Sequence, residues 1–153
     1  MADNFTVTDA LISASELNSL DNQYSGTVDA TAVTTITGTA ADITTVYSSS
    51  GIIGLGNEAV NITDNHTLTQ LKTINNATSG TITLSSVTVA LSGSSADLAA
   101  ALDGSFASAY TGNVTLTDTP TDAQLALIDA ATTGTITYSE GGSGGGGGGN
   151  NDA

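Results

Sequence analysis

The apolar positions of this chain recur at helical spacing in five short stretches. They are marked by the pairs Leu17/Leu20, Ile43/Val46, Leu71/Ile74, Leu98/Leu102 and Leu125/Ile128. Each pair follows a hydroxyl residue that stands three positions ahead of an acid or an amide, which is typical of a helix N-cap. These hydroxyl residues are Ser13, Thr39, Thr67, Ser94 and Thr121, and they recur at a nearly constant interval. The pattern predicts five helices of about two or three turns each in a repeating array.

Between the predicted helices, apolar residues alternate with threonine, as in strands that bury one face. One set of strands follows a glycine, at 26–29, 80–83 and 134–137, and a second set ends in aspartate, at 6–9, 61–64 and 115–118. Shorter β-like runs occupy 33–36 and 87–91. The alternation places the threonines on the outer face of the strands. It places six apolar residues on the inner face: Val7, Val28, Ile62, Ile82, Leu116 and Ile136. We expect the glycines to end the helices as C-caps with positive φ.

The members of each strand set recur at twice the interval of the hydroxyl residues. The full repeat is therefore about 54 residues long and consists of two strand–helix half-units of about 27 residues each. A half-unit cannot bury both its faces alone, whereas stacked neighbours can share one elongated core. We therefore predict an α/β fold, a right-handed repeat solenoid in which helices connect parallel strands. A threonine-rich β-solenoid with short helical corners is the alternative. The repeat domain is expected to span residues 1–139, and residues 140–153 to form a flexible glycine-rich tail.

Charge and composition narrow the classes of function. Fifteen acidic residues stand against one basic residue, Lys72, for a net charge of −14. Nucleic acid binding requires cations that displace counterions from phosphates, and docking on anionic membranes requires basic clusters, so we exclude both. The absence of cysteine excludes disulfides, thiol catalysis and thiolate metal sites. The first ten residues lack the basic start and apolar run of a signal peptide, so no N-terminal export signal is expected.

Three phrases of the sequence resemble a known class of repeats. They are "ISASELNSLD", "VDATAVTTITGTAADITTVYSSSGI" and "GLGNEAVNITD". They are similar to the tandem repeats of large Thr-, Ala- and Asp-rich surface proteins of marine picocyanobacteria and of virion structural proteins of cyanophages, and the similarity covers about residues 6–138. The resemblance implies a surface or structural role and assigns no functional residue. The small size of this chain fits a virion component better than an adhesin fragment.

Few residues are candidates for chemistry. The histidine, His66, stands beside the predicted cap Thr67 and has no nucleophile or orienting acid at a recognisable spacing, which favours a structural role. Most carboxylates fall at repeated positions near helix termini, where capping and solubility explain them. Asp9, Asp64 and Asp118 form a column of equivalent positions that could recruit Ca²⁺, although aspartate also commonly ends strands. "GLG" at 54–56 is too short for a phosphate-binding loop.

The outward threonines resemble the flat ladders of ice-binding solenoids, although Asp29 and Asn61 interrupt the rows. The pairs are Thr6/Thr8, Thr81/Thr83, Thr115/Thr117 and Thr135/Thr137. Threonine is also a common solvent-facing strand residue, and this simpler explanation is preferred.

Together these patterns predict a non-enzymatic structural protein on a virion exterior, as a capsid decoration, knob or fibre, without a resident cofactor. A secreted or cell-surface adhesin or ligand-binding module is the main alternative, and an ice-binding solenoid a minor one. The strand near 135–138 lacks a following helix. We therefore expect other virion or surface proteins, or another copy of the chain, to cover that end.

Overall fold

The computed structural model describes residues 3–138, which contain five helices. They are α1 (Ala14–Gln23), α2 (Ala40–Ser48), α3 (Leu68–Ala77), α4 (Ser95–Leu102) and α5 (Asp122–Ala131). Each begins after the predicted hydroxyl residue, whose side chain accepts a hydrogen bond from the amide three residues later. Helices α3 and α5 carry complete capping boxes, closed by Gln70 and Gln124. All five predicted N-caps are confirmed.

The strands pair in parallel within three sheets of the described chain. The first sheet contains β1 (Phe5–Thr6), β3 (Val28–Asp29) and β5 (Ile52–Ile53). The second contains β2 (Leu11–Ser13), β4 (Thr35–Gly38), β6 (Ala59–Ile62) and β7 (Ile82–Thr83). The third contains β8 (Leu91–Gly93), β9 (Val114–Leu116) and β10 (Ile136–Thr137). The predicted α/β class with parallel strands is confirmed.

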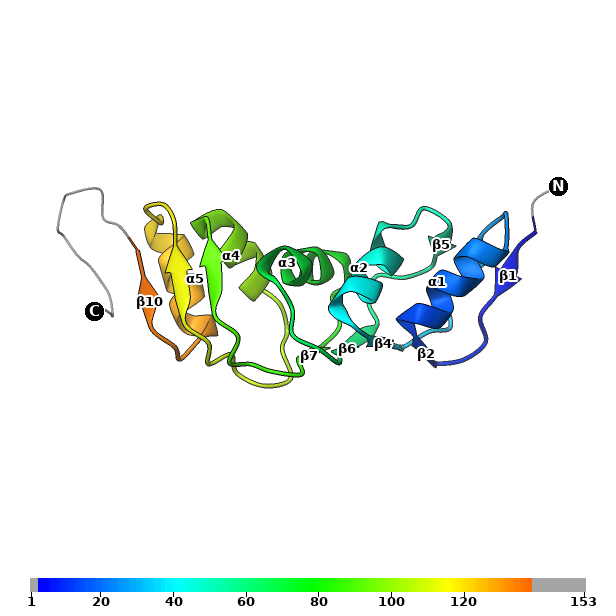
Figure 1. The fold of residues 1–153 in the computed structure, drawn as a ribbon, viewed down its shortest axis with the longest axis horizontal. Coiled ribbons are helices and arrows are strands. Elements are labelled where there is room, and N and C mark those ends of the chain that lie inside the picture. Colours follow the sequence, from blue (N-terminus) through cyan, green and yellow to red (C-terminus); the bar gives the residue numbers. More distant parts are fainter. Residues whose placement is uncertain (1–2, 139–153) are drawn as a thin grey trace.

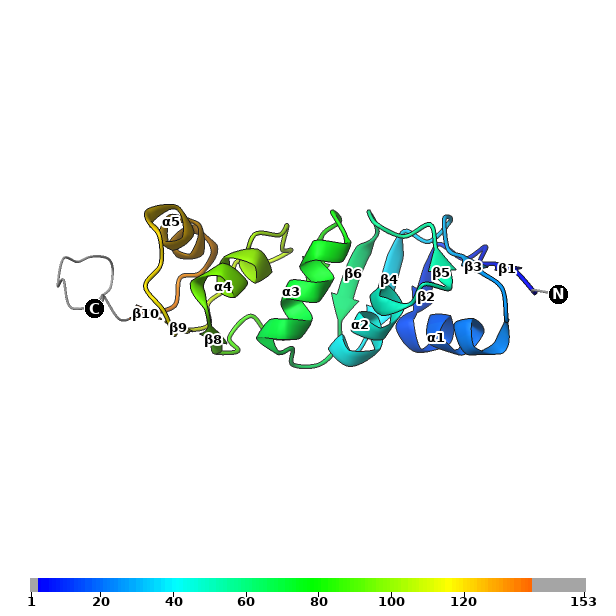
Figure 2. The same ribbon diagram turned by 90° about the horizontal axis from the view of Figure 1, so that it is seen from above.

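Helices and strands succeed one another along a single long axis (Figure 1). The five helices stand in chain order in one row, and the first and last described strands, β1 and β10, lie at opposite ends of that row (Figure 2). Contacts between helices join each helix to the next one in sequence. The buried apolar residues form two clusters, and Leu84 and Phe106 pack against both. The core is therefore elongated and extends along the row.

The predicted division into inside and outside is confirmed. The six inward positions, Val7, Val28, Ile62, Ile82, Leu116 and Ile136, are all buried. The eight threonines of the outward pairs are all exposed. Because side chains on a strand alternate between its two faces, the burial of one set places the other in solvent.

The predicted role of the glycines is wrong. Helices α1, α3 and α5 end at Tyr24, Thr78 and Thr132 with extended backbone, two residues before the glycine. Among the described glycines, positive φ occurs at Gly54 and Gly56. Instead, the glycines after the helices allow close approach between neighbouring units. A Cβ at Gly80 would lie 2.2 Å from the carbonyl oxygen of Glu58, and one at Gly134 would lie 2.3 Å from that of Gly112.

Two strands begin later in the chain than the shorter runs predicted at 33–36 and 87–91. Strand β4 begins at Thr35 because the amide of Val33 donates to the Ala30 carbonyl in a turn, at 3.0 Å. Strand β8 begins at Leu91, since the carbonyl of Val87 accepts from the amides of Thr111 and Gly112 outside any strand. The predicted tail at 140–153 lies outside the described residues.

Candidate functional site

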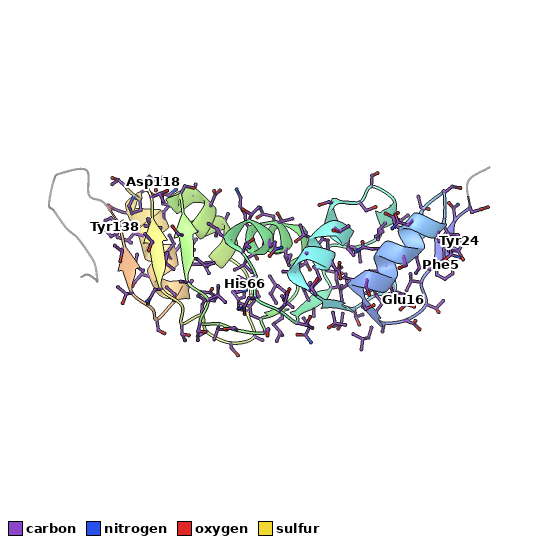
Figure 3. The ribbon with its side chains drawn as sticks, in the orientation of Figure 1. Phe5, Glu16, Tyr24, His66, Asp118 and Tyr138 are labelled. Atoms are coloured by element: carbon purple, nitrogen blue, oxygen red, sulfur yellow. The ribbon has the colours of Figure 1, made fainter. Side chains whose placement is uncertain are left out.

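His66 lies in the core near the middle of the molecule (Figure 3). Its side chain is 3% exposed, and its Nε2 is 3.0 Å from the hydroxyl of Tyr110, which is 1% exposed. His66 precedes the cap Thr67, and the equivalent positions one full repeat before and after it hold Ile12 and Pro120. The histidine therefore occupies a position where another repeat buries an apolar side chain.

Hydrogen bonding determines that the Nε2 nitrogen of this histidine carries a hydrogen. The Tyr110 hydroxyl donates to the carbonyl of Val89, so its hydrogen is used and Nε2 of His66 must be the donor between the two side chains. Nδ1 of His66 makes no hydrogen bond within the described part of the chain. Burial lowers the pKa of His66, against a smaller opposing effect of the Asp64 carboxylate. Burial also raises the pKa of Tyr110 to about 12. Both groups are neutral at pH 7 and enclosed, which supports the structural assignment of His66.

A buried carboxylate, Glu58, was not singled out from the sequence. It is 1% exposed. Its Oε1 accepts from the amides of Gly56 and Asn57, at 2.8 and 3.1 Å, and its Oε2 accepts from the hydroxyl of Tyr47. Burial and this carboxylate raise the pKa of Tyr47 well above its usual range. Three donors compensate the desolvation of Glu58, and two of them are backbone amides of the turn that contains Gly56.

This arrangement bears on the "GLG" segment. Two backbone amides that could bind an external anion already donate to the Glu58 carboxylate. The segment is therefore occupied by a side chain of its own chain, consistent with its rejection as a phosphate-binding loop. The only sequence signal for this role is an acid two residues after the second glycine of a glycine-rich turn.

Two of the three candidate calcium ligands bind helix termini. Oδ1 of Asp64 accepts from the amide of Ala40, and Oδ1 of Asp118 accepts from the amide of Ser95, both at 2.8 Å. Each aspartate thus caps a helix of the preceding unit. Asp9 is exposed beyond β1. The structure does not bring the three together, and no group of three or more His, Asp or Glu side chains suited to a metal occurs among residues 3–138. Calcium binding stays a prediction.

Other polar side chains also connect successive units. Asn4 Oδ1 accepts from the amide of Thr27 at 2.8 Å, and Asn113 Oδ1 accepts from Thr135 at 2.9 Å. Lys72 Nζ lies 2.6 Å from Asp97 Oδ1, which links α3 to α4 and lowers the pKa of Asp97. These polar side chains at or near the surface therefore help to hold successive units together.

The outward face of the sheets carries rows of hydroxyl groups. In one sheet Ser92, Thr115 and Thr137 stand side by side in register. In the second sheet the row is Ser13, Thr37, Asn61 and Thr83, and in the first it is Thr6, Asp29 and Ile53. The predicted interruptions at Asn61 and Asp29 are confirmed. This face can offer hydroxyl groups to a partner.

No protein-family model matches the chain, and comparisons with curated proteins and with solved structures found no similar protein. Within residues 3–138, no helix is both long and apolar enough to span a bilayer.

Proposed function

We propose that the chain is a right-handed repeat solenoid, with half-units of about 27 residues and full repeats of about 54 residues. Equivalent hydrogen bonds support this proposal. Thr78 Oγ1 donates to the Glu58 carbonyl at 2.6 Å, and one full repeat later Thr132 Oγ1 donates to the Gly112 carbonyl at 2.8 Å. The strands around them pair in the same register, Val60 with Ile82 and Val114 with Ile136. Helices of eight to ten residues favour this fold over a β-solenoid with helical corners.

On this architecture we propose a non-enzymatic structural role on a virion exterior, as a decoration, knob or fibre protein of a marine cyanophage. The observation that carries it is the elongated row of units (Figure 1). In this row the buried side chains of Glu58 and His66 bind Tyr47 and Tyr110 of other segments. The resemblance of the repeats to those of cyanophage virion proteins agrees with this role. Partners would be other virion or surface proteins, or a second copy at the C-terminal end, without nucleic acid or membrane.

Mass spectrometry of phage particles purified on a density gradient tests the proposed location. The chain should co-purify with the capsid or tail proteins at a constant ratio across the particle peak. Its absence from the particles would contradict the virion role. A supernatant protein of the infected culture, added before purification, serves as the control for adsorption.

A secreted or cell-surface adhesin is the alternative, favoured by the exposed hydroxyl rows, which suit contact with a polar ligand. Neighbouring genes distinguish the two roles, because capsid or tail genes accompany a virion protein and a secretion cassette accompanies an adhesin.

Ice binding is the minor alternative, supported by the row of Ser92, Thr115 and Thr137. Thermal hysteresis of the purified chain would support it. If hysteresis is no greater than that of an unrelated acidic protein, this alternative is wrong.

A further inference from the structure

The two outermost helices each have an apolar residue that is less buried than its equivalents. Leu17 and Leu71 are 0% exposed, whereas Leu125, at the same position of α5, is only half-buried. Helix α2 follows α1 and helix α4 follows α3 in the row, but no described helix follows α5. The outer side of Leu125 therefore lacks the helix that covers this position elsewhere.

At the opposite end of the row, helix α1 also has an apolar residue that is less buried than its equivalents. Ile74 and Ile128 are 0% exposed, whereas Leu20, their equivalent on α1, is half-buried. No described helix precedes α1. Phe5 and Tyr24 lie at the same end, with ring centroids 4.9 Å apart (Figure 3).

The strands at the two ends likewise have an edge without a described partner strand. The amides of Val28 and Ile82 donate to the carbonyls of Gly51 and Ser105, both at 2.8 Å. Ile136 is their equivalent on β10, the last strand of its sheet, and no described strand pairs with its outer side. At the other end, β1 is the first strand of its sheet.

We propose that these ends bind each other in two copies of the chain, the C-terminal end of one against the N-terminal end of the next. This inference rests on the proposed stacking of repeats. Strand β10 pairs in parallel with β1 of the second copy, and Leu125 packs toward the second copy's α1 near Leu20. A head-to-tail contact keeps the parallel pairing found throughout the described sheets, whereas a symmetric contact of β1 with β1 would require an antiparallel pair.

The hydrogen-bond pattern restricts the register of this contact. The amides of Phe5 and Val7 donate to the carbonyls of Thr27 and Asp29, so the amide and carbonyl of Thr6 point to the free edge of β1. The amide of Val114 donates to the carbonyl of Thr135, so the polar groups of Ile136 point to the free edge of β10. Of the registers that this pattern permits, the proposed contact takes the one that places Ile136 opposite Phe5 of the second copy. Thr137 then stands beside Thr6, which continues the hydroxyl row across the junction.

Charge makes the contact dependent on salt. The chain has a net charge of −14, and the exposed carboxylates Asp3, Asp122 and Asp129 lie on the terminal segments. Like charges repel at low ionic strength, and the screening length falls from about 10 Å at 0.1 M salt to about 3 Å at 1 M. Association should therefore strengthen as sodium chloride is added.

Sedimentation velocity of two variants and their mixture tests the proposal. Leu20→Asp blocks the N-terminal end, and Leu125→Asp blocks the C-terminal end. In 1 M sodium chloride the unmodified chain should form dimers and longer oligomers as its concentration rises. Each variant alone should associate at least tenfold more weakly, and an equimolar mixture should form a dimer through the two intact ends and grow no further. Thr45→Asp adds the same charge at an exposed site on α2 and should associate as the unmodified chain does.

Circular dichroism establishes whether the variants fold. If Leu20→Asp does not, Thr6→Pro replaces it, because proline there removes an outward amide that no described strand uses. A chain that stays monomeric at every salt concentration overturns the proposal, as does a variant that associates by itself as strongly as the unmodified chain. If the chain is found in virions but is monomeric, the virion role stands and this inference fails. If the chain self-associates but is absent from virions, this inference stands and the virion role fails.

Discussion

At the residue scale, the buried positions of the repeat contribute to stability and the exposed positions contribute to solubility. Leu71 is 0% exposed between α3 and the sheets, while Thr83 stands outward on β7. The apolar position tolerates little change because the elongated core is closely packed. The outward position loses few contacts on substitution.

We expect Leu71→Ala to lower the free energy of unfolding by about 2–5 kcal/mol, through lost burial and the cavity left behind. Thr83→Ser, the matched exposed control, should change it by about 0.5 kcal/mol or less. Urea denaturation followed by circular dichroism measures both. Equal destabilisation of the two variants would contradict the assignment of inside and outside.

The buried imidazole of His66 predicts a dependence on pH. Its pKa is lowered in the folded chain, so between that pKa and the ordinary value of about 6.5 the unfolded chain binds more protons. The stability that the neutral imidazole contributes is complete above about pH 6.5 and is lost as the pH falls through this window.

The variant His66→Ile removes this proton linkage and places the side chain of the equivalent Ile12 in the core. Between pH 7.5 and 5, the unmodified chain should therefore lose more stability than the variant, and the difference should be constant above pH 7. Denaturation series in urea at each pH provide the comparison. Parallel curves for the two proteins would show that His66 does not titrate on unfolding.

At the scale of the elements, close contact between units depends on the glycines that follow helices α3 and α5. At Gly80, an added methyl group would meet the backbone of the preceding strand segment, 2.2 Å from the Glu58 carbonyl oxygen. The backbone cannot yield as the end of a flexible side chain would. The same approach recurs at Gly134 against Gly112, so it belongs to the repeat.

We expect Gly80→Ala to destabilise the fold by about 1–3 kcal/mol, as overpacking of a close contact generally does. Thr81→Ala, at the neighbouring exposed position, should have a much smaller effect. Thermal unfolding measures both variants under the same conditions. A neutral Gly80→Ala would show that the units can separate at this contact without loss of stability.

At the scale of the whole molecule, the acidic charge acts on folding. One ion pair, Lys72 with Asp97, is found among residues 3–138, and the chain carries a net charge of −14. Repulsion among the remaining carboxylates favours the expanded chain. Salt screens this repulsion much more than it weakens one partly exposed pair.

The midpoint of thermal unfolding should therefore rise as sodium chloride increases from about 0.01 to 0.5 M, and then level off as the screening length falls below the spacing of the charges. Differential scanning calorimetry at dilute protein concentration measures it and limits self-association. A midpoint that falls with salt would indicate that local ion pairs outweigh the overall repulsion.

The sequence by itself determined the elements that rest on local chemistry. A hydroxyl residue, an acid or amide three positions later and apolar residues at helical spacing located all five N-caps, since capping joins groups within one turn. The alternation around Ile82 and Ile136 likewise identified the buried face, because the period of a strand is two.

Only the tertiary structure decided what depends on approach between units. It showed that Gly80 and Gly134 permit close contact, a role that local sequence cannot distinguish from a helix C-cap. It placed His66 against Tyr110, 44 residues away, and the Asp64 carboxylate on the N-terminus of a helix 24 residues earlier. Such pairs depend on which segments stack side by side, and that is set by strand register and packing across the whole row rather than by neighbours in the chain.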